Sequence, residues 1–156
     1  MHPYRKFVLM IVVSSALMYC LMYLNTYQLS HVWFSQTRLF MTLIMAGSMA
    51  LVMLFFMRDM YKDKGANLAL VLGSFALMGL GVWLVRSQVT VGDVAWMKAM
   101  IPHHSIAILT SERANISDPR VRKLADDIIE AQRQEIGEME ALIEDLREQR
   151  PAAPSQ

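Results

Sequence analysis

Residues 39–57 of the chain read LFMTLIMAGSMALVMLFFM, an apolar run without a charged side chain. A helix of about 20 predominantly apolar residues is long enough to cross the hydrocarbon core of a bilayer. Because backbone groups in hydrocarbon must form their hydrogen bonds within the segment, such a run is expected to be helical. Residues 7–24 and 68–85 form two runs of the same kind. The sequence therefore predicts three transmembrane helices, at about 7–24, 39–57 and 68–85, surrounded by a lipid bilayer.

The distribution of charge divides the chain into two parts. Residues 1–85 contain six Lys or Arg and two acidic residues, whereas the remainder contains nine Lys or Arg and twelve acidic residues. We therefore expect a membrane domain at 1–86, an outer helical domain at 90–149 and a disordered tail at 150–156. The net charge is +1 and no basic face is visible, so nucleic acid is not an expected partner.

The short loops carry a charge asymmetry that predicts the orientation of the spans. On one side of the membrane lie five cations, Arg5, Lys6, Arg58, Lys62 and Lys64. On the other side lie Arg38 and Arg86. Because cationic loops stay in the cytoplasm, we expect a cytoplasmic N-terminus and an outer C-terminal domain. In a bacterium this describes a multi-pass protein of the inner (plasma) membrane with a periplasmic domain. The first apolar run is too long for a cleaved signal peptide, so we expect it to remain as an anchor.

Methionine is the unusual component of the composition, with 14 residues against a single cysteine, Cys20. One cysteine excludes an internal disulfide, and Cys20 is interpreted as a small hydrophobe in a membrane helix. In the second span five methionines recur every four residues: Met41, Met45, Met49, Met53 and Met57. They are interpreted either as flexible apolar packing or as a track of weak thioether sites for Cu(I).

The part after Arg86 has the start and stop signals of two helices. Thr90 or Asp93 is expected to cap a helix that runs through Ala114, with a kink near Met100–Ile101 because Pro102 lacks a backbone donor. The segment Ser117–Asp118–Pro119 supplies a cap and a first-turn proline for a second helix, which ends at about Gln149. The outer domain is therefore predicted to be a two-helix hairpin.

The second of these helices has an apolar stripe with polar residues inside it. Its rows are Val121, Ile128, Glu135 and Leu142, then Ala125, Gln132, Met139 and Leu146, then Ile129, Ile136 and Ile143. A carboxylate at a buried position is costly unless it is paired or binds a metal ion. Because one hairpin cannot cover such a stripe well, we expect two copies to form a four-helix bundle, which makes the protein a homodimer.

Soft metal donors gather on the hairpin. Met97, Met100 and His104 follow one another at i, i+3 and i+7, and His103 lies about 100° further round the same helix. Folding the hairpin would bring Gln132, Glu135 and Met139 across from them. Thioether and imidazole together select copper, with Cu(I) favoured, over magnesium, calcium or manganese. Structural zinc would usually recruit cysteine, and a di-iron bundle requires a Glu-x-x-His spacing that does not occur here.

Each of these residues also has a purely structural interpretation. A methionine at a helical core position is usually packing, and a histidine beside a helix kink is often only hydrogen-bonded. Glu135 would then form an ion pair with Lys98, with Lys123 or with an arginine of a second chain.

The segment Met97-Lys-Ala-Met100-Ile-Pro-His-His104-Ser-Ile-Ala-Ile108 resembles the signature of a bacterial family called domain of unknown function 305. The later positions Pro119, Ala125, Ile128, Ile129, Gln132, Glu135, Ile136 and Met139 resemble its second helix. The resemblance covers Asp93 to about Leu142 and implies a ferritin-like bundle, exported or membrane-anchored, with members linked to copper binding and resistance. It supports Met97, Met100, His103, His104 and Met139 as ligands, and Gln132 and Glu135 match the motif. Two departures are the lack of further methionines, at Ile106 and Thr110, and the single copy of a unit that often occurs twice.

The expected function is therefore that of a non-enzymatic, membrane-anchored periplasmic copper-binding protein, which sequesters copper, hands it to a copper-handling partner protein or confers tolerance. The alternative is a structural or regulatory membrane subunit whose outer hairpin docks on a partner. A small metal-dependent oxidase or electron-transfer module is a third hypothesis with less support, because no further cofactor motif is present.

Overall fold

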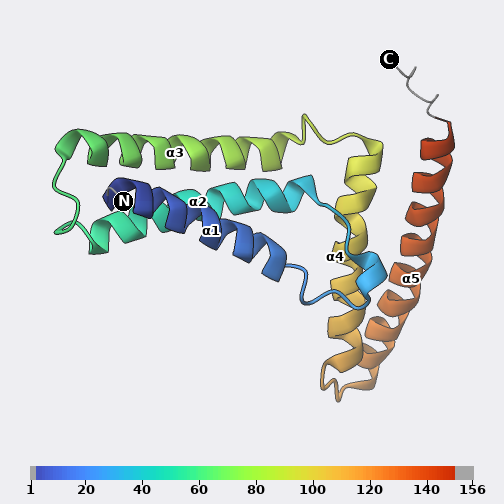
Figure 1. Cartoon of the computed structure of the whole chain (residues 1–156). Helices are drawn as coiled ribbons and strands as arrows, with labels where there is room; N and C mark the ends of the chain where they lie inside the picture. Colours follow the sequence, from blue (N-terminus) through green and yellow to red (C-terminus); the bar gives the residue numbers. More distant parts are fainter. Residues whose placement is uncertain (1–2, 150–156) are drawn as a thin grey trace. The chain divides into compact units, whose positions relative to one another are not determined.

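The computed structural model describes residues 3–149, and over this range the chain is all-helical without a strand (Figure 1). The elements are α1 (Pro3–Leu21), the short 3-10 helix η1 (Leu29–His31), α2 (Gln36–Phe56), α3 (Lys64–Ser87), α4 (Asp93–Arg113) and α5 (Pro119–Glu148). The all-α prediction is confirmed. The predicted tail at 150–156 lies outside the described residues, and the ferritin-like and dimeric parts of the prediction stay predictions.

Within the described residues, three helices are long and apolar enough to cross a membrane. They are α1 with 19 residues, α2 with 21 and α3 with 24. Each corresponds to one of the predicted spans, but the helices extend beyond the apolar runs at one or both ends. Asp63 begins α3 by accepting hydrogen bonds from the backbone N–H groups of Gly65 and Ala66, at 2.9 and 3.0 Å. This cap satisfies two donors that the first turn of a helix leaves without partners.

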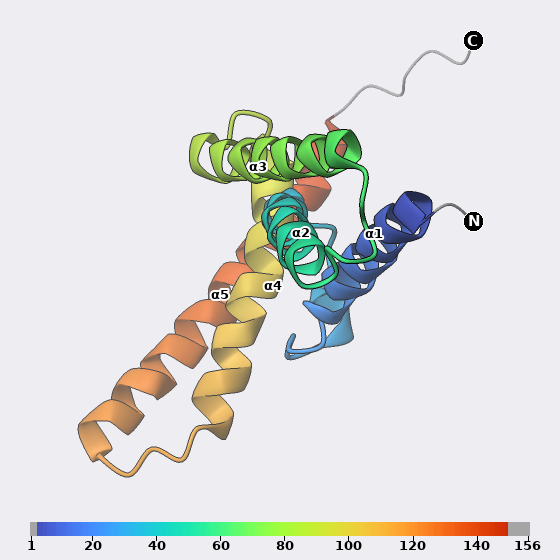
Figure 2. The same ribbon diagram turned by 90° about the vertical axis from the view of Figure 1, so that its left-hand side faces the viewer.

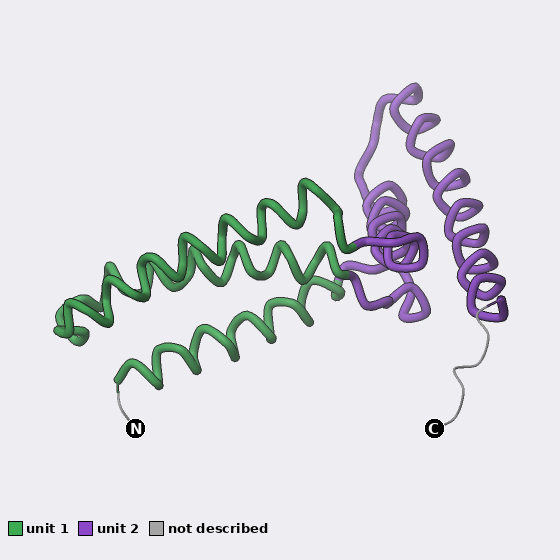
Figure 3. The backbone as a smooth tube through the Cα atoms, turned by 90° about the horizontal axis from the view of Figure 1, so that it is seen from above, with its two compact units in different colours: residues 1–24, 36–90 green, residues 25–35, 91–156 purple. Residues whose placement is uncertain are grey.

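The chain divides into two compact units, residues 1–24 with 36–90 and residues 25–35 with 91–156 (Figure 3). In the first unit α2 packs closely against α3 through glycines. A Cβ atom on Gly47 would lie 2.8 Å from the carbonyl oxygen of Ser74, and one on Gly81 would lie 3.0 Å from that of Phe40. Small residues allow membrane helices to approach in this way.

A second contact of this unit joins α1 to the loop before α3. The Phe7 side chain is buried against Tyr61, Ala50 and Leu54. Tyr4 donates its hydroxyl hydrogen bond to the Asn67 Oδ1, at 2.9 Å, and its oxygen accepts from the Asp63 backbone N–H. The methionines of α2 have different environments. Met41 and Met45 are exposed, whereas Met53 and Met57 pack on the cluster around Phe7.

In the second unit α4 and α5 lie side by side as a hairpin (Figure 2). Their core consists of Met97, Ile101 and Ile108 from α4 and Ile136, Met139 and Ile143 from α5. Asp118 caps α5 by accepting from the Arg120 backbone N–H at 2.8 Å, and Pro119 occupies the first turn as predicted. The residue that caps α4 is Gly92, whose cap involves no side chain, so the prediction of Thr90 or Asp93 is wrong.

Pro102 lies inside α4 without interrupting it. The helix is assigned continuously from Asp93 to Arg113, and Pro102 is buried. Proline at this position removes the bond that its N–H would have made to the carbonyl of Lys98, and its ring crowds that carbonyl. The cost of that missing bond is offset by the packing of the turns on both sides of it.

The loop between α1 and α2 belongs to the hairpin unit rather than to the unit of the three long helices. Residues 25–35 cluster with α4 and α5, and η1 contacts α4. The sequence analysis placed this loop in the membrane domain at 1–86. In the structure Tyr27 and Trp33 pack on the core of the hairpin. The loop therefore covers part of the apolar stripe from within the chain.

Candidate metal-binding site

In the predicted ligand set, His104 is the residue whose two ring nitrogens both have a contact partner. Its Nδ1 lies 3.0 Å from the carbonyl oxygen of Met100, one turn earlier in α4. A carbonyl only accepts, so Nδ1 carries the proton and donates to it. This bond fixes the ring and directs Nε2 towards α5. A ligating histidine in a metalloprotein is usually oriented in the same way.

The neighbour of Nε2 is Glu135. The distance from His104 Nε2 to Glu135 Oε2 is 2.7 Å, and the contact joins the two helices of the hairpin. The side chain of His104 is 11% exposed, and that of Glu135 is 52% exposed. With a proton on both nitrogens the contact is an ion pair. A metal ion bound to Nε2 would take the place of a proton on that nitrogen.

The position of Glu135 corrects the prediction of an inward, buried carboxylate. The heptad row of Glu135 forms the exposed edge of α5, because Val121, Ile128 and Leu142 are 49%, 37% and 45% exposed. The buried residues of the stripe are instead Ala125, Ile136, Met139 and Ile143. The reason is geometric: the apolar band on α5 is wider than the contact that one neighbouring helix can cover.

His103 and Met100 are the predicted donors of α4 that lie next to His104 in the sequence or one turn before it. His103 is exposed, and its ring centroid is 6.0 Å from that of His104, with the planes at 65°. Met100 is half-buried and packs against the edge of the hairpin core. These two side chains are the soft donors next to His104 that are not fully buried, whereas Met97, which shares its side of α4, lies in the core.

The other three predicted ligands do not join the His104–Glu135 pair. They are Met97, Met139 and Gln132. Met97 and Met139 are 4% and 6% exposed and belong to the hydrophobic core, where their sulfurs pack among isoleucines. Gln132 is half-buried on α5. Among residues 3–149 no group of three or more His, Cys, Asp or Glu side chains is arranged to hold a metal ion. One chain thus contributes two contacting donors, His104 and Glu135, with His103 and Met100 beside them.

The sequence analysis missed a third histidine of the same unit, which comes from loop 25–35. His31 is 8% exposed, and its Nδ1 lies 2.9 Å from the Oγ of Ser105, the residue that follows His104. The Ser105 oxygen also accepts a hydrogen bond from the Tyr27 backbone N–H at 2.7 Å. The pair holds loop 25–35 against α4. The only signal in the sequence was a loop rich in aromatic residues and without Lys, Arg, Asp or Glu.

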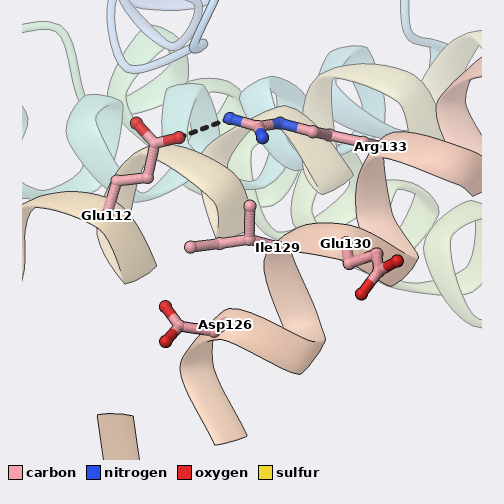
Figure 4. Close-up of a pocket in the computed structure, with 5 residues that line it drawn as sticks. All are labelled: Glu112, Asp126, Ile129, Glu130 and Arg133. Atoms are coloured by element: carbon pink, nitrogen blue, oxygen red, sulfur yellow. Dashed lines mark hydrogen bonds and ion pairs between the residues drawn. The ribbon is translucent and has the colours of Figure 1, made fainter. Parts of the chain in front are cut away.

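An open pocket of about 490 Å³ lies near the turn of the hairpin, lined by Glu112, Asp126, Ile129, Glu130 and Arg133 (Figure 4). Arg133 donates to the Glu112 carboxylate across the hairpin at 2.6 Å. Asp126 is already paired with Arg122 at 2.8 Å. These groups are ordinary ion pairs of exposed helix faces, so the pocket is not the site of the predicted metal chemistry.

Comparison with known proteins identifies the hairpin. Residues 93–156 match the model of a family described as domain of unknown function (DUF305). An uncharacterized protein of Acanthamoeba polyphaga mimivirus is 30% identical over 110 residues, which cover 69% of this chain and 70% of the relative. That alignment is longer than the segment 93–156, so the similarity extends into the part of the chain that precedes α4. No solved structure matches the chain significantly. Because the family model matches the hairpin and the relative aligns with most of the chain, the chain belongs to the DUF305 family.

Proposed function

We propose that the chain is a membrane-anchored copper-binding protein that sequesters copper or hands it on outside the cytoplasm. The observation that carries this proposal is the pair of His104 and Glu135, in which the Met100 carbonyl orients the imidazole and leaves its Nε2 beside a carboxylate. Binding is the whole activity in this proposal, without a catalytic step.

The neighbouring donors favour copper over a hard cation. Met100 supplies a thioether one turn before His104, and His103 supplies a second, exposed imidazole. Thioether and imidazole donors suit copper, and the thioether favours Cu(I). We further propose that the N-terminus is cytoplasmic and that the hairpin lies on the outer side, which in a bacterium is the periplasmic side of the inner membrane. The charge asymmetry of the loops supports this orientation.

The test is a Cu(I) competition titration on the full chain in detergent. The double variant His103→Ala/His104→Ala is expected to lose most of its Cu(I) affinity, because it removes both imidazoles. The matched control is Met10→Leu/Met18→Leu, which changes two thioethers of α1 and is expected to bind as the parent does. A double histidine variant that binds Cu(I) as tightly as the parent would overturn the proposal.

A specific observation favours a second function, a structural subunit that docks on a partner protein. Met97 and Met139 serve as packing residues in the core, and the His104–Glu135 contact is a sufficient structural ion pair by itself. This function predicts that the purified parent chain retains no Cu(I) against a competing chelator. The same titration therefore separates the two proposals.

A further inference from the structure

A single chain leaves one side of its hairpin open. Loop 25–35 covers the side on which Tyr27 and His31 contact Ser105 of α4 and approach Ile136 of α5. The His104–Glu135 pair marks the opposite edge of the two helices. At 100° per residue, a set of α5 residues with Glu135 among them lies within about 60° of one another on this edge. They are Val121, Leu124, Ile128, Glu135 and Leu142.

We call this surface the open face, and it includes Trp96 and His103 of α4. Its apolar side chains are unusually exposed, with Leu124 at 59% and Trp96 at 51%. Contiguous exposed apolar residues around polar groups mark an interaction surface. A lipid surface is disfavoured as the occupant, because it would bury the His103 ring without a hydrogen-bond partner and would take the half-exposed Glu135 carboxylate out of water.

The polar groups of the open face on one copy are complementary to those on a second copy. Helix α4 contributes the imidazoles of His103 and His104, and α5 contributes the carboxylate of Glu135 at the same level. A two-fold axis through this face would set α4 of each copy against α5 of the other. The imidazoles of one copy would then approach the carboxylate of the other. Confinement of both copies to one bilayer would raise their effective concentration.

The number of metal donors that one chain brings together also favours a second copy of the chain as the occupant of the open face. One chain brings only His104 Nε2 and Glu135 Oε2 into contact, with His103 and Met100 beside them, whereas two copies would offer a copper ion an oriented imidazole from each. Over the described residues no third His, Cys, Asp or Glu completes the group. We propose that the copper site is shared between two copies of this chain, each of which contributes His104 and Glu135 through its open face. This inference rests on the proposed function.

The test mixes parent chains with chains that carry His103→Ala/His104→Ala. The two are co-expressed in equal amounts, purified together in detergent without selecting pairs, and titrated with Cu(I). A shared site needs two parent chains, so the capacity is expected to fall to about a quarter of the parent value. A site complete within one chain would leave about a half, which would overturn the inference and leave the proposed function standing. Parent chains that bind no Cu(I) would overturn the proposed function and the shared site with it.

A second measurement, made without metal, tests the open face itself. Sedimentation of the full chain in detergent is expected to give a dimer for the parent, and a shift towards monomer for Ile128→Lys and for Leu142→Lys. The control Ala141→Lys puts the same charge on the far side of α5 and is expected to remain a dimer. Circular dichroism of each variant must match the parent in helix content. A parent chain that is monomeric at micromolar concentration would overturn the shared site.

Discussion

At the scale of single residues, the His104–Glu135 contact determines how the candidate site is understood. Its carboxylate is half exposed, so the pair resembles a surface salt bridge more than a buried one. Exposed ion pairs stabilise proteins by about 0–1 kcal/mol. The contact is therefore strong enough to position an imidazole and too weak to be needed for folding.

Replacing Glu135 with Leu separates these two roles. We expect the free energy of unfolding of the metal-free chain to change by about 1 kcal/mol or less, because little desolvation is gained or lost. We expect Cu(I) affinity to fall, because the carboxylate donor is gone. Thermal unfolding by circular dichroism and a Cu(I) competition titration measure the two effects. A large loss of stability without loss of affinity would show that Glu135 is structural. The variant Glu135→Gln, which keeps the shape, serves as the control.

Asp118 gives a pH-dependent prediction. Its hydrogen bond with the Arg120 side chain, and then the bond from the Arg120 backbone, hold the pKa of that carboxyl below its ordinary value. A carboxyl with a lowered pKa stabilises the fold above its ordinary pKa, and this stabilisation is lost as the pH falls through the lowered pKa. The Tm of the parent should therefore drop at acid pH more than that of Asp118→Asn, which keeps a capping oxygen without the charge. Melting curves between neutral and acid pH check this.

The control for Asp118 is Asp127, which lies on the exposed side of α5 and pairs with Lys123. We expect Asp118→Ala to lower the Tm at neutral pH, since the first turn of α5 loses its cap. Asp127→Ala should leave the Tm almost unchanged. Equal effects of the two substitutions would contradict the capping role.

At the scale of elements, the contact between α2 and α3 depends on glycine. Gly47→Ala would place a Cβ 2.8 Å from a backbone oxygen of α3, so the helices must move apart, at a cost of about 1–3 kcal/mol. Gly73 lies on the same helix as Gly81, but a Cβ there meets nothing within 4 Å. Gly73→Ala should raise stability by about 0.5–1 kcal/mol, because alanine is the better helix residue. Unfolding in mixed micelles measures both, and effects of the same sign would contradict this packing.

The attachment of loop 25–35 to the hairpin is the other prediction at this scale. Ser105→Ala removes the partner of the half-buried Tyr27 N–H and of the buried His31 Nδ1. The expected cost is about 1–3 kcal/mol, together with faster amide exchange in residues 25–35. Thr110→Ala is the matched control, since the Thr110 hydroxyl bonds only to carbonyls of its own helix. Hydrogen exchange followed by mass spectrometry distinguishes the two variants.

At the scale of the whole molecule, the positive-inside asymmetry makes a prediction about orientation. A reporter that is active only outside the cytoplasm should be active when fused after Gln156. The same reporter should be inactive when fused after Lys62, in the loop that carries most of the cations. The reverse pattern would overturn both the orientation and the outer location of the hairpin.

The helices, their approximate ends and the cap of α5 could be predicted from the sequence. These features depend on residues close together in the chain: apolar runs, the order Asp118–Pro119, and heptad spacing. The clustering of methionine and histidine along one helix could also be predicted, because their spacing fixes which side of the helix each residue occupies.

Only the tertiary structure decided which donors meet. Periodicity placed Glu135 within the apolar stripe, but the width of one neighbouring helix left its row exposed beside His104. Met97 and Met139 had the right spacing for a site and became core residues, because packing against isoleucines buries their thioethers. His31 and Ser105 are 74 positions apart, and no local pattern relates them. Contacts of that kind depend on the packing of distant segments, which only the folded chain determines.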